Sequence, residues 1–167
     1  MKLKRIGIVG CGAIGSKIAE AVCSDLKGKA KLSALYDVDC AKARDLSGKL
    51  RKKTLVVSSL AELIKKSDFV VEASSAGAAA EIAREALRAK RDCLIMSVGG
   101  LLGAEDIFGL AREKNCSVYV PSGAIAGIDA LKAHKLADIE KVTLTTRKSP
   151  QALSGAPYII KKRIDLD

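Results

Sequence analysis

Aromatic side chains are scarce in this chain of 167 residues: Phe, Trp and Tyr make up 3% of it, and Trp is absent. The hydrophobic fraction nevertheless reaches 49%, so the core must be built from Ala, Val, Ile and Leu. Such a core suits a parallel sheet that is covered by helices. The net charge is +10, but the basic residues are scattered and have no aromatic side chains between them on which bases could stack. We therefore expect no nucleic-acid partner.

Cysteine motifs and long apolar runs are missing as well. The five cysteines form no Cys-x-x-Cys pair and no zinc-ligand spacing, so we expect reduced thiols in a cytoplasmic protein and no metal site. The longest uncharged run, 115–128, is shorter than the roughly 18 residues that suggest a membrane span. The charged N-terminus passes directly into an apolar run and lacks the pattern of a signal peptide. These absences predict a protein without a membrane anchor.

A glycine-rich turn is the strongest functional signal that is present. An apolar run over 6–9 leads into the turn and a helical pattern follows it; its residues are Gly10, Cys11, Gly12, Ala13, Ile14 and Gly15. The first glycine permits the sharp bend, the second lets a pyrophosphate approach the backbone, and the third lets helix and strand pack closely. The thiol of Cys11 is incidental to this pattern. We predict a dinucleotide-binding turn, with a ligand-free glycine turn as the alternative.

Asp37 strengthens that prediction. It ends the next apolar run, 32–37, and lies 22 residues beyond Gly15, close to the spacing of about 20 at which an acid binds the adenosine ribose. A carboxylate there would repel a 2′-phosphate, which favours NAD over NADP. Lys42 and Arg44 follow closely and keep NADP open.

Strand and helix patterns alternate from the glycine turn onwards. Strands are expected at 6–9, 32–37, 54–57, 69–73, 93–97 and 117–120. Helices are expected after the glycine turn and at 41–51, 59–65, 74–89 and 105–114. The helix at 59–65 begins with a capping box at Ser59 and Glu62. The pattern predicts an α/β fold with a doubly wound parallel (Rossmann) sheet.

Ligands of such sheets bind beyond the carboxyl ends of the strands. Besides the glycine turn and Asp37, this edge holds Ala73, Ser74, Ser97 and the loop 121–127. The loop has small side chains that would let a flat ring approach the backbone, and a helix starting near residue 127 would aim N–H groups at an anion. A tightly packed connection without a ligand is the alternative.

The pattern changes after the sixth expected strand. Residues 141–147 alternate and are rich in β-branched side chains, which predicts a strand. A loop at 148–157 and a short apolar run at 158–160 follow it. A lone strand cannot bury its apolar face. We therefore expect an NAD(P)-binding Rossmann domain over 1–125 and the beginning of a catalytic or substrate mixed α/β domain, truncated, over 126–167.

Four stretches together resemble the L-aspartate dehydrogenase family. They are Gly10-Cys11-Gly12-Ala13-Ile14-Gly15, Val71-Glu72-Ala73-Ser74, the loop from Pro121 to Asp129, and Thr143-Leu144-Thr145-Thr146-Arg147-Lys148. The first is generic to dinucleotide binders, whereas the Ser-Gly-Ala-Ile-x-Gly loop and the Thr-x-Thr stretch are more specific. The resemblance covers essentially the whole chain but only the first part of the family's length.

The resemblance implies NAD(P)-dependent oxidation of L-aspartate to iminoaspartate. That imine hydrolyses to oxaloacetate and ammonia or feeds quinolinate and thus NAD biosynthesis. By motif match, the glycine turn would hold the pyrophosphate and Asp37 the ribose. Ala73 and Ser74 would line the adenosine side, and Ala124 would lie beside the nicotinamide. The family also implies a homo-oligomer at full length.

The catalytic residue of the family has no counterpart in this chain. Histidine suits the removal of a proton from the substrate amine at neutral pH, and the resemblance places the family's catalytic His beyond Asp167. The single His, His134, does not match it. We therefore expect cofactor binding with little turnover from these residues alone. Two alternatives stay open: another amino-acid or semialdehyde dehydrogenase, and a non-catalytic module that senses the dinucleotide.

Overall fold

A computed structural model separates the chain into two units, Met1–Ala124 and Ile125–Asp167. It describes residues 3–52, 55–122, 140–145 and 147–166. No helix within these ranges is long and apolar enough to cross a membrane. Whether the two units carry the functions expected of 1–125 and 126–167 stays a prediction.

A parallel sheet forms the centre of the first unit. Its strands are β1 (Lys4–Val9), β2 (Ala30–Tyr36), β3 (Phe69–Glu72), β4 (Asp92–Ile95) and β5 (Val118–Tyr119). All neighbouring strands are parallel, in the order β2-β1-β3-β4-β5. The first strand, β1, thus lies inside the sheet, and later strands are added on both sides of it, which confirms the doubly wound α/β fold.

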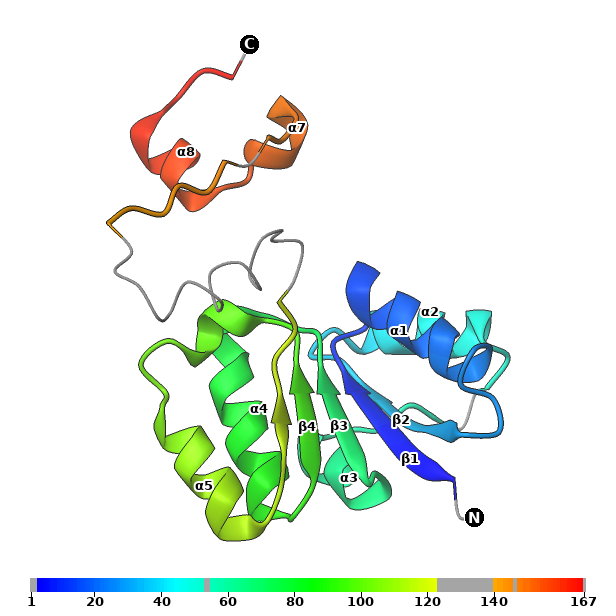
Figure 1. Cartoon of the computed structure of the whole chain (residues 1–167). Coiled ribbons are helices and arrows are strands. Elements are labelled where there is room, and N and C mark those ends of the chain that lie inside the picture. Colours follow the sequence, from blue (N-terminus) through cyan, green and yellow to red (C-terminus); the bar gives the residue numbers. More distant parts are fainter. Residues whose placement is uncertain (1–2, 53–54, 123–139, 146, 167) are drawn as a thin grey trace. The chain divides into compact units, whose positions relative to one another are not determined.

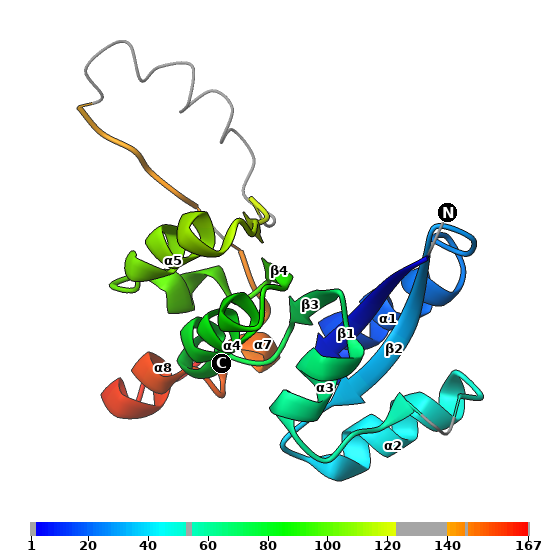
Figure 2. The same ribbon diagram turned by 90° about the horizontal axis from the view of Figure 1, so that it is seen from below.

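Helices cover both faces of this sheet. They are α1 (Ala13–Cys23), α2 (Cys40–Lys49), α3 (Leu60–Lys66), α4 (Ala76–Arg88) and α5 (Asp106–Lys114), with a short 3-10 helix, η2 (Val98–Leu101), after β4. One core joins the sheet to α1 and α2, and a separate core joins it to α3, α4 and α5. Figures 1 and 2 show α1 beside β1 and β2, and α4 beside α5. Small and aliphatic side chains fill both cores, as the composition predicts.

The strand expected at 54–57 is wrong as a full strand. In its described part, Val56 forms a single parallel bridge with Leu35 at the outer edge of β2. The chain leaves the sheet at once because Ser58 donates its N–H to the Glu62 carboxylate at 3.1 Å. The hydroxyl of Ser59 accepts the N–H of Glu62 at 3.2 Å. The capping box therefore starts α3 immediately, at the expense of the strand.

The second unit differs from expectation. Residues 141–145 and 147, expected as a strand, form none, and the side chains of Val142 and Leu144 are 58% and 60% exposed. A strand needs a hydrogen-bonded neighbour, and the described residues offer this segment none. The expected loop contains α7 (Pro150–Leu153), and the apolar run at 158–160 belongs to α8 (Pro157–Lys162).

Candidate functional site

The glycine turn joins β1 to α1 with the geometry that its sequence predicts. Gly10 has φ +93°, and a Cβ there would collide with the carbonyl of Ala73. A Cβ on Gly15 would likewise collide with the carbonyl of Gly10. By contrast, the space beside Gly12 is open. Two glycines are therefore required for packing, and the third leaves the backbone accessible to a ligand.

The start of α1 suits an anion. Gly12 is its N-cap and supplies no side-chain hydrogen bond, and the first turn contains no acidic residue. The first N–H groups of this helix consequently lack a capping side chain, and no acidic residue of its own first turn offsets the positive end of the helix dipole. The combination fits a phosphate group.

Asp37 lies directly against this turn. One carboxylate oxygen accepts the N–H of Cys11 at 2.7 Å, and the other accepts the N–H of Asp39 at 2.9 Å. These bonds hold the Asp37 carboxylate, a hydrogen-bond acceptor, beside the glycine turn and just after the end of β2. An ionised carboxylate still has lone pairs for further donors, such as the hydroxyls of a ribose.

The thiol of Cys11 faces the protein instead of a ligand. It is buried and contacts the carbonyl oxygen of Tyr36 at 3.8 Å. Burial, and secondarily the charge of Asp37, raises the pKa of this thiol to about 12. The thiol stays protonated at neutral pH, so Cys11 offers the site its backbone and no nucleophile.

A cavity of about 280 Å³ opens between Asp37 and α4. Its walls are mainly apolar, with Val38, Leu60, Ala78 and Ile82 among the lining residues. Val38 is 92% exposed, although it is aliphatic. An apolar slot beside a ribose-binding carboxylate fits the flat base of a nucleotide.

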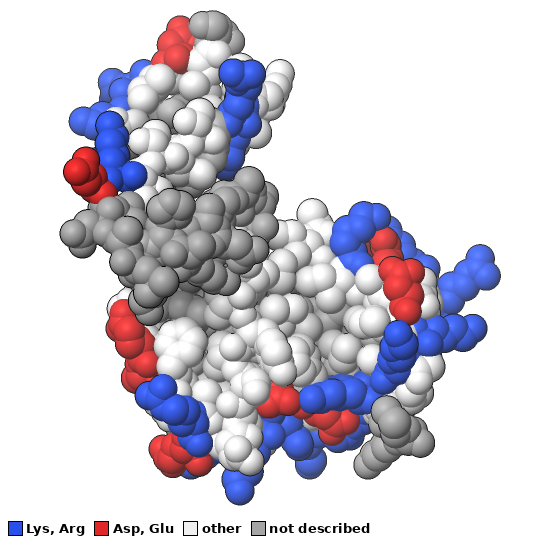
Figure 3. Space-filling view, viewed as in Figure 1, with Lys and Arg blue, Asp and Glu red and all other residues white. Residues whose placement is uncertain are grey.

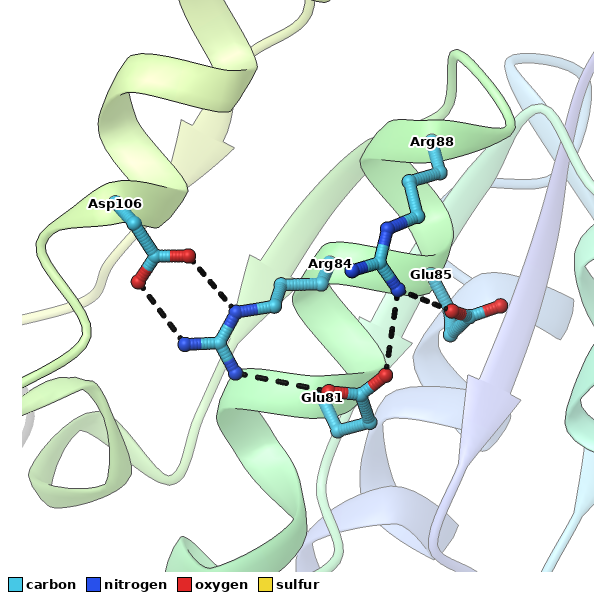
Figure 4. Close-up of polar contacts among 5 residues, drawn as sticks. All are labelled: Glu81, Arg84, Glu85, Arg88 and Asp106. Carbon is cyan, nitrogen blue, oxygen red and sulfur yellow. Dashed lines mark hydrogen bonds and ion pairs between the residues drawn. The ribbon is translucent and has the colours of Figure 1, made fainter.

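Glu81 closes one side of this cavity and belongs to an ion-pair network between α4 and α5 (Figure 4). Arg84 binds both carboxylate oxygens of Asp106, at 2.8 and 2.9 Å. Arg84 and Arg88 lie 3.6 and 3.4 Å from Glu81, and Arg88 also donates to Glu85 at 2.6 Å. The network fixes α4, which forms one wall of the cavity, against its neighbour.

Ser74 and Ser97 meet at a residue that the sequence analysis did not single out. Both bind the carboxylate of Glu72, the last residue of β3, which is fully buried. The signal in the sequence was an acid at the end of a strand that is otherwise apolar, directly before two serines. A buried acid requires hydrogen-bond partners, and the serines supply them.

Some of the other expected residues are described by the structure, and the rest lie outside the described ranges. Ala73 donates its N–H to Val9 at 2.8 Å and packs against Gly10. Lys42 lies 3.8 Å from Asp39, and Arg44 lines a different cavity, beside Ser47 and Val56. Ala124, the helix expected near residue 127 and His134 lie outside the described residues.

The surface charge of the first unit and the arrangement of possible metal ligands also describe the site. On the face shown in Figure 3, Lys and Arg side chains alternate with Asp and Glu, and the middle of the first unit is uncharged. In the described ranges, no three His, Cys, Asp or Glu residues are grouped so that they could hold a metal ion. The site is therefore built from backbone N–H groups, an apolar slot and two carboxylates, Asp37 beside the glycine turn and Glu81 on α4.

Comparison with known proteins agrees with this geometry. The family model described as "Homoserine dehydrogenase, NAD binding domain" matches residues 10–121. The L-aspartate dehydrogenase of Methanocella arvoryzae is 47% identical over 166 residues, which are 98% of this chain and 61% of that protein. The L-aspartate dehydrogenase of Methanocaldococcus jannaschii is 44% identical over 156 residues, which are 91% of this chain and 58% of that protein. The resemblance to these dehydrogenases is thus confirmed, and the chain spans about three fifths of their length.

Solved structures share the fold at lower identity. The myo-inositol dehydrogenase of Lactobacillus casei, in complex with NAD(H) and myo-inositol, superposes with a TM-score of 0.67 at 22% identity, over 79% of this chain and 41% of that one. The UDP-N-acetylglucosamine 3-dehydrogenase GnnA of Acidithiobacillus ferrooxidans gives 0.65 at 21% identity, over 81% and 42%. These likenesses establish the fold alone.

Proposed function

Since this chain belongs to the family described as the NAD binding domain of homoserine dehydrogenase, we propose that it is the cofactor-binding part of an L-aspartate dehydrogenase. The reaction oxidises L-aspartate to iminoaspartate, and NAD supplies the hydride acceptor when it is bound. The imine then hydrolyses to oxaloacetate and ammonia or enters quinolinate and NAD biosynthesis. The high identity to L-aspartate dehydrogenases over nearly the whole chain supports this substrate.

The position of the Asp37 carboxylate carries the cofactor proposal. Its 2.7 Å bond to Cys11 keeps an acceptor beside the accessible backbone of Gly12. The pyrophosphate would bind along residues 10–15 and the start of α1. The ribose would bind at Asp37, and the base would enter the apolar slot next to Val38. Ala73, Ser74 and Ser97 would border the remaining part of the dinucleotide, with Ala124 beside the nicotinamide.

NAD is the preferred cofactor in this proposal, and NADP is the alternative. A 2′-phosphate at the ribose would meet the negative charge of Asp37. Lys42, one of the two cations that could offset this repulsion, already lies near Asp39, and Arg44 lines another cavity. Both features favour an unphosphorylated ribose.

Substrate oxidation requires a base that this chain is not expected to supply. The resemblance assigns this base to a His beyond Asp167. Asp37 and Cys11 cannot replace it, because both are already hydrogen-bonded at the glycine turn. We expect a cytoplasmic protein, because all five cysteines are free. We expect a homo-oligomer on the resemblance alone.

Two measurements test the proposal. Calorimetric titration of the 167-residue protein with NADH should show binding, and NADPH should bind more weakly. A version extended to the length of its relatives should then form NADH from L-aspartate, whereas other amino acids tested in parallel should not react. Absence of NADH binding by a folded protein would refute the cofactor site, and an extended version that oxidises a different amino acid would refute the substrate.

A further inference from the structure

Glu72 is a buried acid that none of the proposed cofactor contacts uses. It ends β3, and its relative exposure is 0%. One carboxylate oxygen accepts the N–H and the hydroxyl of Ser74, at 2.7 and 2.9 Å, and also the hydroxyl of Ser97 at 2.9 Å. The other oxygen accepts the N–H of Ser97 at 3.0 Å. A single side chain inside the sheet therefore binds the backbone and side chain of both serines.

The two serines belong to different loops at the ligand edge. Ser74 follows β3 and leads to α4, whereas Ser97 follows β4 and precedes η2. The glycine turn is connected to the same place, since Gly10 packs so closely on Ala73 that a Cβ would collide with its carbonyl. Movement of residues 73–74 would consequently displace Gly10. Three segments of the edge thus depend on one carboxylate.

The hydrogen bonds also determine what the serines can offer to a ligand. Each hydroxyl has one proton and donates it to Glu72, so each oxygen keeps only its acceptor capacity. Such oxygens suit ligand groups that donate, which in a dinucleotide are ribose hydroxyls, the adenine amino group and the carboxamide N–H. They do not suit phosphate oxygens.

The fold alone gives little reason for an acid here. A buried carboxylate must be desolvated, and replacing a buried polar group and its partners by apolar groups of similar shape is often neutral or stabilising. Being fully buried, Glu72 cannot touch a ligand itself. We infer that Glu72 is a positioning residue of the dinucleotide site, which fixes the loops after β3 and β4 and presents Ser74 and Ser97 as acceptors. The inference rests on the proposed cofactor function.

The test compares Glu72→Gln with a control that is buried in the same strand. Gln keeps the shape but replaces one acceptor oxygen by a donor, which leaves a serine donor without a partner. NADH affinity, measured by calorimetry well below the unfolding temperature, should fall about tenfold, because the unsatisfied donor favours loop positions in which Ser74 and Ser97 no longer face the dinucleotide, and binding must then restore them. Val70→Ala removes a fully buried side chain of β3 and should lower the unfolding temperature while leaving NADH affinity within about twofold of the wild type. Ser97→Ala, which keeps Glu72 buried, should lower NADH affinity about threefold.

Amide hydrogen exchange provides a readout that needs no ligand. In Glu72→Gln, the amides of Ser74 and Ser97 should exchange faster than in the wild type, and in Val70→Ala they should keep their protection relative to neighbouring amides. Should Glu72→Gln fail to fold, Ser97→Ala decides the matter by the same measurement: loss of one partner of the Glu72 carboxylate should speed amide exchange at Ser74, and unchanged exchange at Ser74 would overturn the inference. Wild-type protein that binds NADH while these variants bind it equally well would overturn the inference alone. Folded wild-type protein that does not bind NADH would overturn the proposed function and the inference with it.

Discussion

The two units differ in the burial of their apolar side chains. In the first, Ile8, Leu87 and Ile95 are fully buried between the sheet and its helices. In the second, Leu144, Tyr158 and Ile160 are 60%, 65% and 63% exposed. Apolar sequence is present in both, but burial requires an opposing layer, and a doubly wound sheet supplies one on each face. The measurable stability and the cofactor site should therefore both reside in the first unit.

A matched pair of truncations should separate the units most strongly. Leu87→Ala empties a fully buried position on α4 and should lower the free energy of unfolding by about 3 kcal/mol. Ile160→Ala removes a similar volume from α8, where the side chain is 63% exposed, and should change it by less than about 0.5 kcal/mol. Urea denaturation followed by circular dichroism measures both. Equal effects would mean that the second unit has a core of its own.

The glycine turn should show the next largest effect, because its backbone geometry excludes a side chain. Gly10→Ala places a Cβ at φ +93° against the carbonyl of Ala73. It should cost about 2 kcal/mol of stability and weaken NADH binding about 100-fold, measured by denaturation and calorimetry. Gly109→Ala is the control, since its Cβ would meet nothing within 4 Å in α5 and should stabilise that helix by up to about 1 kcal/mol. Unchanged NADH affinity in Gly10→Ala would remove the turn from the site.

Some of the features behind these predictions could be predicted from the sequence, and others could not. The glycine turn and Asp37 could be predicted because a turn, its helix and one acid at a set spacing form a local pattern. The strand expected at 69–73 was likewise indicated by its apolar residues, of which Val70 and Val71 are buried. Local patterns were sufficient wherever one supersecondary unit determines the structure.

The remaining features depend on partners that are distant in sequence. The run at 54–57 has strand composition, but its described part forms a single bridge, between Val56 and the distant Leu35 of β2. Residues 141–147 alternate correctly but have no strand neighbour in the described ranges. The hydrogen bonds of Glu72 depend on Ser97, which is 25 residues away and donates its N–H to the Glu72 carboxylate. Composition and periodicity contain no information about such pairings.

Asp37 should test the cofactor edge more gently than Gly10. Asp37→Asn keeps the size but removes the charge, so NADH affinity should fall about tenfold and NADPH should lose less, since the repulsion of its 2′-phosphate is relieved. Competitive titration with the two cofactors measures the ratio. Asp45→Asn makes the same chemical change on α2, where the side chain is 79% exposed, and should leave both affinities unchanged. An unaltered NADH to NADPH ratio in Asp37→Asn would mean that this acid does not contact the ribose.

The smallest effect should come from a polar contact of the first unit at the opposite end of the sheet from the glycine turn. Arg5 donates to both carboxylate oxygens of Asp68, and these hydrogen bonds hold the pKa of Asp68 well below its usual range. A carboxylate whose pKa is lowered by folding stabilises the protein above its unfolded pKa of about 3.9, and the stability is lost as the pH falls toward the folded value. Because the pair is about one-third exposed, Asp68→Asn should lower the unfolding temperature by only about 2 °C at pH 7. This difference should shrink between about pH 5 and about pH 2, where the wild type also loses the charge.

Calorimetric scans between about pH 7 and about pH 2 measure this difference in unfolding temperature, with Asp45→Asn as the variant expected to follow the wild type throughout. A difference between Asp68→Asn and the wild type that grew on acidification would show that the pair does not stabilise the first unit through its charge.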